Sequence, residues 1–577
     1  MSRIDIQKII ETNNYSWVEK VPNFSKPMLY KFINKTINAN EMNKILARFS
    51  DKRNFEFIDE LFKYLNFSYS ISHLDKLNIP AEGKVVCVSN HPLGALDGLA
   101  ILHAISRIRR DVLIVANDLL QQVENLKELF LPYNVISGVV QPDNIKKISE
   151  AIKNDYAVIF FPAAVVSRLT PKGIRDGKWS MGAMKLAMKH NAPILPIYIQ
   201  ARNSTSFYCT SIINKSISML LLPNEIFNKT NKEIVLRIGN IIPPSSLAAI
   251  ADARVRNKLL KKHVYKLNKR NFEVFKTEKT IIHPVESRTI VKELSNAKLL
   301  ATTQDNKSIY SVTYTESPNV VKEIARLREI TFRKVGEGTG KTSDFDRYDK
   351  HYNHIVLWDN KNLEIIGSYR IGFCRTILEN QGISGLYNAE EFNFSEEFQE
   401  KLPQSLEMGR SFIQQKYWMS NALDYLWQGI CAFKHEVKDI KYMFGAVSIS
   451  NTYSEEAKAM IVYYYTKWFG DQNNLVTSKN PYFLSKKQLE ECANLFNTKD
   501  KHLDFRILKS TLRELGLSVP TMFRRYTELV EEDGVVFTGF NKDMNFSNCV
   551  DGFIILDINK IKKSYKLRYN FIEEETK

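Results

Sequence analysis

A histidine and an aspartate share one short segment that is rich in glycine and proline, SNHPLGALDG (residues 89–98). His91 could take a proton from an attacking hydroxyl, and Asp97 could hold the imidazole tautomer and stabilise its charged form. The alternative is a structural histidine in an ordinary loop. The sequence contains no GxSxG segment, so direct transfer is favoured over a covalent enzyme intermediate.

A second group of residues that could do chemistry lies beyond the midpoint and comprises Asp344, Asp346, Asp349, Arg370, Glu407 and Arg410. Three acids in a loop could bind a metal, cap a helix or face solvent. Because EF-hand spacing is missing, no metal site is expected. Neighbouring strand residues point to opposite faces, so Glu407 and Arg410 share a face only if the strand ends or bulges between them. A buried ion pair between Glu407 and an arginine is the structural alternative.

Short apolar runs surround the segment with His91 and Asp97 and must position these two residues. They are KVVCVSN (84–90), DVLIVAN (111–117), NVISGVV (134–140), YAVIFFP (156–162), APILPIYI (192–199) and EIVLRIGNIIPP (233–244). Runs rich in Val and Ile that alternate with helices indicate buried strands of an α/β fold, and such folds place active sites at the carboxyl ends of strands. Residues 1–75 are predicted to be helical instead, with apolar stripes at Met28, Phe32, Ile33, Ile37, Phe55, Ile58, Leu61, Phe62 and Leu65.

The second half has a different pattern. SIYSVTYTE (308–316) is predicted as a strand, and HIVLWDNKNLEIIGSYRIGF (354–373) as a hairpin with its turn at 360–362. QSLEMGRSFI (404–413) adds a strand before a helical stretch, NALDYLWQGICAFKHE (421–436). We place the boundary near Pro284, which gives domains at 1–283 and 284–577.

Length and composition bound the class of protein. A chain of 577 residues exceeds one ordinary core, so two domains are expected. Six single cysteines without a CxxC pair indicate neither a zinc site nor a disulfide framework, and fit a reducing cytoplasm. The sequence has neither a signal-peptide core nor an uncharged apolar run of about 18 residues, so a soluble or peripheral protein is expected.

The net charge of +17 calls for an anionic partner or a Lys-rich solvated surface. We do not expect nucleic acid to be the partner, because the sequence contains no zinc finger, RNP motif or basic zipper. Residues 253–279 predict a basic amphipathic helix with Val255, Leu259, Val264 and Leu267 on one face. Such a helix suits anionic lipid headgroups or an acidic carrier protein, although an ordinary terminal helix remains the alternative.

Residues 80–245 resemble the lysophospholipid/glycerol-phosphate acyltransferases. The likeness lies in the His-to-Asp segment, in FFPAAVVSR (160–168) and in APILPIYIQARNS (192–204). The resemblance implies transfer of an acyl group from a thioester to a lipid hydroxyl, with His91 as base and Asp97 as its partner. Asn90 and Arg168 would bind substrate, the arginine by holding an anionic group.

Two departures from that family are visible. Five residues, Pro92 to Leu96, separate His91 from Asp97 where the family usually has four, and related amino-acid-lipid enzymes share this HPLGxLD form. FPAAVVSR also lacks the family's glutamate. The missing carboxylate leaves open a changed acceptor or an inactive first site.

The second half resembles the acyl-homoserine-lactone synthases and, more closely, the ornithine-lipid N-acyltransferases, both related to the GNAT fold. The shared features are Arg328, Phe332, Asp346, Asp349, Arg370, Glu407, Arg410, LWQGI (426–430) and PTMFRRYTELV (520–530). The resemblance implies transfer of a 3-hydroxyacyl chain from acyl carrier protein to the amine of an amino acid. Glu407 would orient or deprotonate the amine, nearby acids would attract it, and Arg370 or Arg410 would take the carboxylate.

Together the halves resemble the bifunctional amino-acid-lipid synthases. The expected architecture is a glycerol-phosphate-acyltransferase-like α/β domain followed by a GNAT-like α+β domain. The expected product is an ornithine or glycine lipid, made by N-acylation in the second half and O-acylation in the first. No cofactor is implied beyond the co-substrate, acyl-ACP or acyl-CoA. Acyl carrier protein and the anionic inner face of the cytoplasmic membrane would be its partners.

Two alternatives stay open at this point. One is a lysophosphatidic-acid-type acyltransferase with a non-catalytic second half. The other is a membrane-tethering or hemolysin-like protein with two decayed acyltransferase folds.

Overall fold

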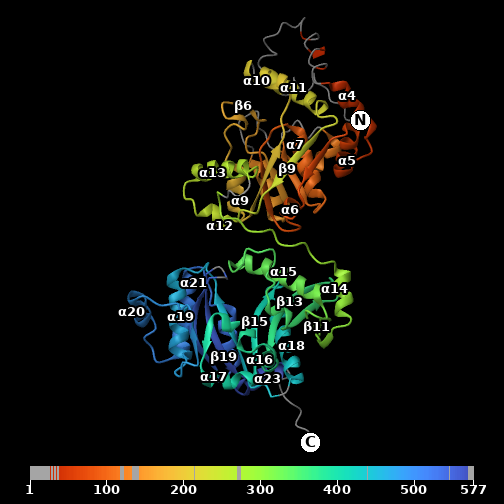
Figure 1. The fold of residues 1–577 in the computed structure, drawn as a ribbon. Coiled ribbons are helices and arrows are strands. Elements are labelled where there is room, and N and C mark those ends of the chain that lie inside the picture. The colour runs from red at the N-terminus through yellow and green to blue at the C-terminus, as the bar shows by residue number, and fades with distance from the viewer. Residues whose placement is uncertain are drawn as a thin grey trace. The chain divides into compact units, whose positions relative to one another are not determined.

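The computed structural model forms two compact units, Met1–Ile282 and His283–Lys577 (Figure 1). The structure describes residues 26, 30, 31, 34, 38–116, 123–132, 142–213, 215–269, 274–437, 439–544, 546 and 548–569. The first unit is α/β and the second is α+β, which confirms the predicted fold class.

The first unit is built on a seven-stranded sheet in the order β1-β9-β8-β2-β5-β3-β4. Its strands are β1 (Ser68–Ile71), β2 (Val85–Ser89), β3 (Val112–Ala116), β4 (Phe130–Pro132), β5 (Ala157–Phe160), β8 (Ile194–Gln200) and β9 (Glu233–Ile238). All neighbours are parallel except β8 and β9. The central strands β2 and β5 are buried at every position, which explains why their sequences are unbroken apolar runs.

Helices cover both faces of this sheet. One core contains apolar residues of α5 (Asn54–Leu65) and α7 (Ala95–Ser106), and the other contains those of α8 (Pro142–Lys153), α9 (Gly182–Lys189) and α13 (Ala253–Lys266). The remaining elements are α4 (Ala39–Arg48), α6 (His73–Lys76), the hairpin β6 (Arg168–Thr170) with β7 (Gly173–Arg175), α10 (Thr205–Ile213), α11 (Lys215–Phe227) and α12 (Pro244–Ala248).

Five of the six predicted strands of this half are confirmed as β2, β3, β5, β8 and β9. NVISGVV (134–140) lies outside the described residues, as do Met28, Phe32, Ile33 and Ile37 of the predicted first stripe. The second stripe is confirmed on α5, where Ile58, Leu61, Phe62 and Leu65 are buried.

Two predictions about helices need correction. Residues 1–75 are not helical throughout, because α5 ends at Leu65 and Ser68–Ile71 pairs with β9 as an edge strand. The basic helix ends at Lys266, and Val255 is 47% exposed rather than part of the apolar face. Leu260 and Val264 are the apolar residues that this helix buries.

The second unit is built on an eight-stranded sheet in the order β10-β11-β12-β13-β15-β16-β19-β18. Its strands are β10 (Lys298–Thr302), β11 (Lys307–Thr313), β12 (Asn353–Asp359), β13 (Glu364–Phe373), β15 (Ser405–Ile413), β16 (Tyr442–Ile449), β18 (Val535–Asp543) and β19 (Cys549–Asp557). Neighbours are antiparallel except β15 and β16, which run parallel. The predicted strand 308–316, hairpin 354–373 and strand 404–413 are confirmed as β11, β12–β13 and β15.

The two faces of this sheet differ. One packs in a large core with α18 (Ala422–Glu436), α19 (Glu455–Phe469), α21 (Lys501–Glu514) and α22 (Thr521–Leu529), and α18 confirms the predicted helix at 421–436. The other face meets α14 (Ser287–Leu294), α15 (Pro318–Val335) and an aromatic cluster around Phe398. No helix among the described residues has both the length and the apolar character needed to cross a membrane.

Candidate active sites

The first candidate site lies where β2 ends and α7 begins. Nδ1 of His91 lies 3.0 Å from Oδ2 of Asp97. Gly94 precedes the first residue of α7 with φ 107°, a backbone conformation that glycine adopts without strain. This turn brings the two predicted catalytic side chains together at the carboxyl end of a central strand.

Asp97 is a buried carboxylate at the amino terminus of a helix. Its Oδ2 accepts hydrogen bonds from the backbone N–H of Leu93 (2.7 Å) and of Gly94 (3.1 Å). Burial raises the pKa of Asp97, while His91 and these two amides act in the opposite direction. Because the helix N-terminus and the imidazole both favour negative charge here, the carboxylate can stabilise a protonated His91.

The His91 ring is poised for proton transfer. It is stacked on Phe161, with ring centroids 4.2 Å apart, and its side chain keeps 17% of its surface exposed. When Nδ1 donates to Asp97, Nε2 is the basic nitrogen, so the ring can accept a proton from a hydroxyl.

Two asparagines hold the backbone around His91. The side chain of Asn90 accepts from the N–H of Ile199 (2.7 Å) and donates to its carbonyl (3.0 Å), which ties β2 to β8. The amide of Asn203 donates to the carbonyl of Pro92 at 3.1 Å. Asn90 is 3% exposed and both of its polar ends are occupied, so its geometry is that of a positioning residue, and its predicted contact with substrate remains a prediction.

Asp176 is a carboxylate that sequence reasoning missed. Its Oδ1 accepts from the backbone N–H of His91 (3.2 Å) and the hydroxyl of Ser167 (2.5 Å), and its Oδ2 accepts from Trp179 Nε1 (2.9 Å). Ser167 in turn donates its N–H to the carbonyl of His91 at 2.7 Å. An acid therefore does lie against the segment FPAAVVSR. The acid in GIRDGKW, which follows the turn between β6 and β7, was the available signal.

Arg168 lies next to this loop. Its guanidinium stacks over the ring of Phe207 at 4.8 Å, and its buried Nη1 has no hydrogen-bond partner among the described residues. Burial lowers the pKa of Arg168. The unpaired Nη1 of Arg168, one residue after the Ser167 that contacts His91, fits the predicted role of holding an anion.

The second candidate site is an ion-pair network on one face of the second sheet. Arg328 of α15 is 0% exposed and donates to both oxygens of Asp349, at 2.9 and 2.7 Å. Its Nε also lies 2.9 Å from Oδ2 of Asp344. Burial acts to raise the pKa of Asp349, but Arg328 and Arg370 outweigh it and hold that pKa well below its usual range. These residues are interior, so Arg328 and Asp349 are placed to support a site rather than to touch a substrate.

Arg370 links the interior to the partly exposed Asp346. Its Nη1 lies 2.7 Å from each oxygen of that carboxylate, and its guanidinium lies among the rings of Tyr348, Tyr352 and Tyr387, at 5.8, 5.3 and 5.0 Å. Burial acts to raise the pKa of Asp346, but Arg370 outweighs it and lowers that pKa. Arg370 is therefore held by Asp346 and an aromatic cage, while its buried Nη2 has no hydrogen-bond partner among the described residues.

Glu407 occupies a closed position. Its Oε1 accepts from the N–H and side-chain amide of Asn388, at 2.6 and 2.7 Å, and its Oε2 accepts from the N–H of Tyr387 (3.2 Å) and the hydroxyl of Tyr352. The residue is 2% exposed. Burial raises its pKa. Its described partners include no arginine, so the alternative of an ion pair is wrong, while its role as base remains a prediction.

Glu407 and Arg410 do share a face, because β15 is irregular between them. Arg410 has φ 49°, and the register with β13 shifts between Ser368 and Arg370. Nη2 of Arg410 donates to the hydroxyl of Tyr387 at 3.1 Å, the residue whose N–H contacts Glu407. The bulge that Glu407 and Arg410 need in order to point to the same face of the strand is therefore present.

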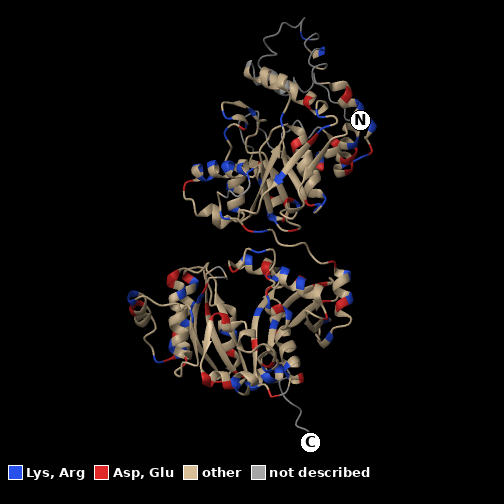
Figure 2. Ribbon diagram, viewed as in Figure 1, with Lys and Arg blue, Asp and Glu red and all other residues tan. Residues whose placement is uncertain are grey.

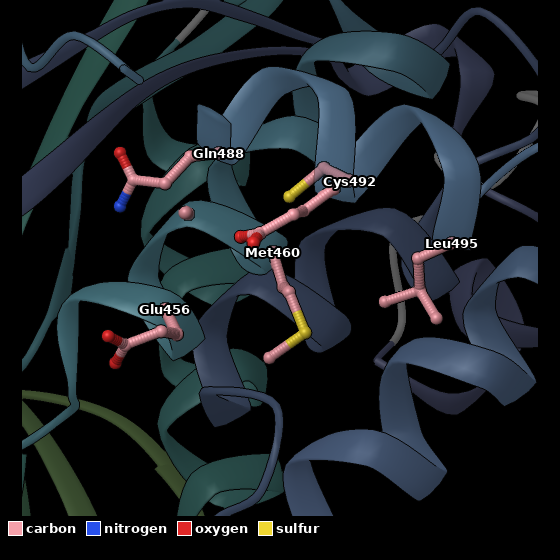
Figure 3. A pocket seen from close by; sticks show the side chains of 7 residues that line it. Glu456, Met460, Gln488, Cys492 and Leu495 are labelled. Atoms are coloured by element: carbon pink, nitrogen blue, oxygen red, sulfur yellow. The ribbon is translucent and has the colours of Figure 1, made fainter. Parts of the chain in front are cut away.

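Only part of this network reaches the surface. Arg410 retains 12% and Asp346 25% side-chain exposure, and Nη2 of the arginine lies 3.9 Å from Oδ2 of the aspartate. This pair presents one positive and one negative group, which suits the carboxylate and the amine of an amino acid. A separate hollow between α19 and α20 (Lys486–Leu495) is lined by Glu456, Met460, Gln488, Cys492 and Leu495, and holds none of the predicted site residues (Figure 3).

Comparisons with known proteins agree with this two-part architecture. Residues 9–272 match the acyltransferase family, and residues 327–428 match the acetyltransferase (GNAT) domain. The glycine N(alpha)-acyltransferase of Phocaeicola vulgatus is 35% identical over 304 residues, which cover 50% of this chain and 92% of the relative. The lyso-glycine lipid O-acyltransferase of the same organism is 28% identical over 271 residues, covering 46% of this chain and 95% of the relative.

A third relative is more distant. The L-ornithine N(alpha)-acyltransferase of Agrobacterium fabrum is 30% identical over 121 residues, which cover 19% of this chain and 40% of that protein. The chain is therefore an acyltransferase that belongs to the family of the glycine N(alpha)-acyltransferases, and it joins an acyltransferase domain to a GNAT domain.

Proposed function

We propose that this chain makes a diacylated aminolipid in two steps. The second unit transfers a 3-hydroxyacyl group from a thioester to the amine of an amino acid. The first unit then transfers a second acyl group to the 3-hydroxyl of that product. The observation that carries the proposal is the His91–Asp97 couple, a base for a hydroxyl acceptor, on one chain with a domain whose relatives are named for N-acyl transfer.

Glycine is the proposed amino acid. The glycine-named relative of the GNAT domain aligns over 92% of its length, whereas the ornithine-named one aligns over 40%. The reachable charges support a small acceptor as well, since Arg410 and Asp346 provide one cation for a carboxylate and one anion for an amine.

Fusion of the two units gives the order of steps a physical advantage. The monoacylated product of the second unit is the acceptor for the first, and tethering raises its local concentration without any new contact.

Acyl carrier protein is the proposed donor of the acyl group. The proposed site of action is the inner face of the cytoplasmic membrane. The net charge of +17 supports both proposals, because the carrier protein is acidic and the membrane surface is anionic. Along α13, the exposed residues Arg254, Lys258 and Lys262 form one basic stripe (Figure 2). His91, Asp97 and Glu407 are the proposed catalytic residues, with Glu407 proposed to orient the amine. Asn90, Arg168, Arg328, Asp346, Asp349, Arg370 and Arg410 are proposed to bind or position substrates.

The test is expression in a bacterial host that lacks aminolipids, followed by mass spectrometry of its phosphate-free lipids. The unaltered chain should produce a diacylated glycine. His91→Ala should stop at the monoacyl species, and Glu407→Ala should abolish both. His73→Ala, at an exposed histidine of the same unit, is the matched control and should leave the diacyl product unchanged. A diacyl product that survives His91→Ala would disprove the assignment of the first site.

A further inference from the structure

The strands β15 and β16 separate on the sheet face that carries Glu407. They pair only from Ser405 with Tyr442 to Glu407 with Phe444, although both strands continue beyond this point. The two backbones are still close just past the last pair, since a Cβ on Gly445 would lie 2.1 Å from the carbonyl oxygen of Met408. Glu407 therefore lies at the closed end of the separation, and Arg410 lies farther along on its β15 side.

Asp551 lies on the other side of this separation. It is on β19, opposite Ser448 of β16, four residues beyond Phe444. Side chains alternate along β19, and Phe553 and Ile555 belong to the aromatic cluster on the Glu407 face. Asp551 therefore points to the same face of the sheet as Glu407, at a level of β16 beyond its last pair with β15.

Asp551 is a buried carboxylate that can still accept a hydrogen bond. It is 6% exposed, and its Oδ1 has no hydrogen-bond partner among the described residues. A buried acceptor without a donor is costly in a native fold and needs an explanation. The described part of this face offers a contrast in Glu407, whose two oxygens receive four hydrogen bonds.

Glu337 reaches the same end of β16 from the other direction. Gly336 ends α15 at φ 79°, and a Cβ there would lie 2.7 Å from Thr452 Cγ2 and 3.3 Å from Ser450 Oγ. The N–H of Glu337 then donates to the carbonyl of Phe332 at 2.8 Å. Because Ser450 follows the last residue of β16, Glu337 lies close to the Ser448–Asp551 pair.

We infer that Asp551, with Glu337 beside it, is the proton acceptor when the second unit acylates an amine. This inference rests on the proposed N-acyl transfer. The acceptor arrives as an ammonium and gives one proton to the carboxylate of Asp551. Its freed electron pair then attacks the thioester carbonyl carbon. As the C–N bond forms and the C–S bond breaks, the nitrogen loses a second proton, which the departing thiolate takes up.

The electrostatics of the site support this assignment. Burial raises the pKa of Asp551 to about 7, and burial followed by the charge of Asp551 raises the pKa of Glu337 to about 8. A general base works best when its pKa is near the operating pH. Asp346 is a weaker candidate, because Arg370 lowers its pKa and contacts both of its oxygens.

Charged and titratable groups face Asp551 from several elements. They are Arg410 on β15, Asp543 on β18, Glu391 before the short strand β14 (Phe392–Phe394), Cys549 on β19, Tyr387 and Glu337. Asp543 and Glu391 raise the pKa of Asp551, whereas Ser448 and Arg410 lower it. An amino acid whose carboxylate contacts Arg410 would therefore carry its amine into a group of acids.

The test is steady-state kinetics of the full-length chain with glycine and a 3-hydroxyacyl thioester of coenzyme A or of carrier protein. N-acylglycine and free thiol are measured over about pH 5.5–9.5, a range that spans the expected pKa of the base. The unaltered chain should gain activity through an acidic limb near neutral pH. Asp551→Asn should lower kcat by about 100-fold or more and abolish that limb, with little change in KM for the thioester. Asp551→Glu should restore part of the rate.

A second variant separates catalysis from folding. Glu391→Gln removes a group that raises the pKa of Asp551, so it should move the acidic limb to lower pH. Wild-type kcat and pH profile in a folded Asp551→Asn variant would overturn the inference. So would an acidic limb that Glu391→Gln does not move. If the unaltered chain forms no N-acylglycine from either thioester, the proposed function itself fails, which is a different result.

Discussion

Oδ2 of Asp97 lies 3.0 Å from Nδ1 of His91 and accepts hydrogen bonds from two backbone N–H groups of the same turn. One carboxylate oxygen thus fixes the imidazole and closes the first turn of α7. The longer spacing between His91 and Asp97 is compatible with a direct contact, because the extra residue is accommodated in a turn through Gly94.

This contact predicts the effect of Asp97→Asn. The amide can still accept from the backbone, but it no longer stabilises a protonated His91. Transfer to the hydroxyl should fall by about 100-fold or more while the fold is retained. Conversion of monoacyl to diacyl lipid by the purified protein measures it.

A matched control exists within the same unit. Nε2 of His103 lies 2.7 Å from Oδ1 of Asp59, a second His–Asp contact away from the carboxyl end of β2. Asp59→Asn makes the same chemical change there and should leave the transfer rate unaltered. Equal losses in both variants would mean that Asp97 acts only through stability.

Asp176 predicts a combined loss of stability and rate. Asp176→Ala leaves the His91 amide, the Ser167 hydroxyl and the Trp179 indole without their acceptor. Each unsatisfied buried donor costs about 1–3 kcal/mol, so the free energy of unfolding of the first unit should fall by several kcal/mol. Denaturant unfolding measures it. Asp176→Asn, which keeps an oxygen acceptor, should lose less, and an unchanged stability in Asp176→Ala would contradict the role.

The Arg328–Asp349 pair predicts a different kind of loss. Arg328→Met leaves a buried carboxylate without its bidentate partner, which typically costs about 3–5 kcal/mol. Thermal unfolding should show a large decrease in Tm. Lys44→Met, at an exposed ion pair with Glu41, is the control and should change Tm little, because surface pairs contribute about 1 kcal/mol or less.

Asp349 also predicts acid sensitivity. Its pKa in the folded protein lies below the unfolded value, so its stabilising contribution is present above about pH 4 and is lost as the pH falls further. Acid titration of the Arg328→Met variant should therefore show a smaller additional loss of stability than the unaltered chain.

Asp551 and Glu337 predict the opposite dependence on pH. Their folded pKa values, about 7 and about 8, lie above those of the unfolded chain. The folded state therefore keeps protons that the unfolded state has lost, and stability should fall as pH rises from about 4 to about 8. Asp551→Asn should raise the free energy of unfolding at about pH 8, on the order of 1–3 kcal/mol, and change it little at about pH 4. A variant that is equally stable or less stable at both pH values would contradict the raised pKa.

Much of the fold could be predicted because the signals are local. The buried strands of the first unit read as unbroken apolar runs, and the hairpin of β12 and β13 reads as two alternating runs around a polar turn. The edge strand Ser68–Ile71 escaped prediction, because its sequence has no apolar run and its partner β9 lies far along the chain.

The candidate sites divide in the same way. His91 and Asp97 are six positions apart, so a single turn brings them together, and the residue types alone indicated the chemistry. Tyr352, Asn388 and Asp551 could not be chosen from the sequence. Each acquires its meaning from a partner brought by another element, as with the Tyr352 hydroxyl that meets Glu407 55 positions away.

The sequence by itself therefore determined the two domain types, the residue types available for proton transfer and the excess of positive charge. Only the tertiary structure decided which carboxylates are satisfied and which are free. That difference depends on burial and on hydrogen bonds between distant segments, which set the cost of a charge far more than the identity of its neighbours along the chain.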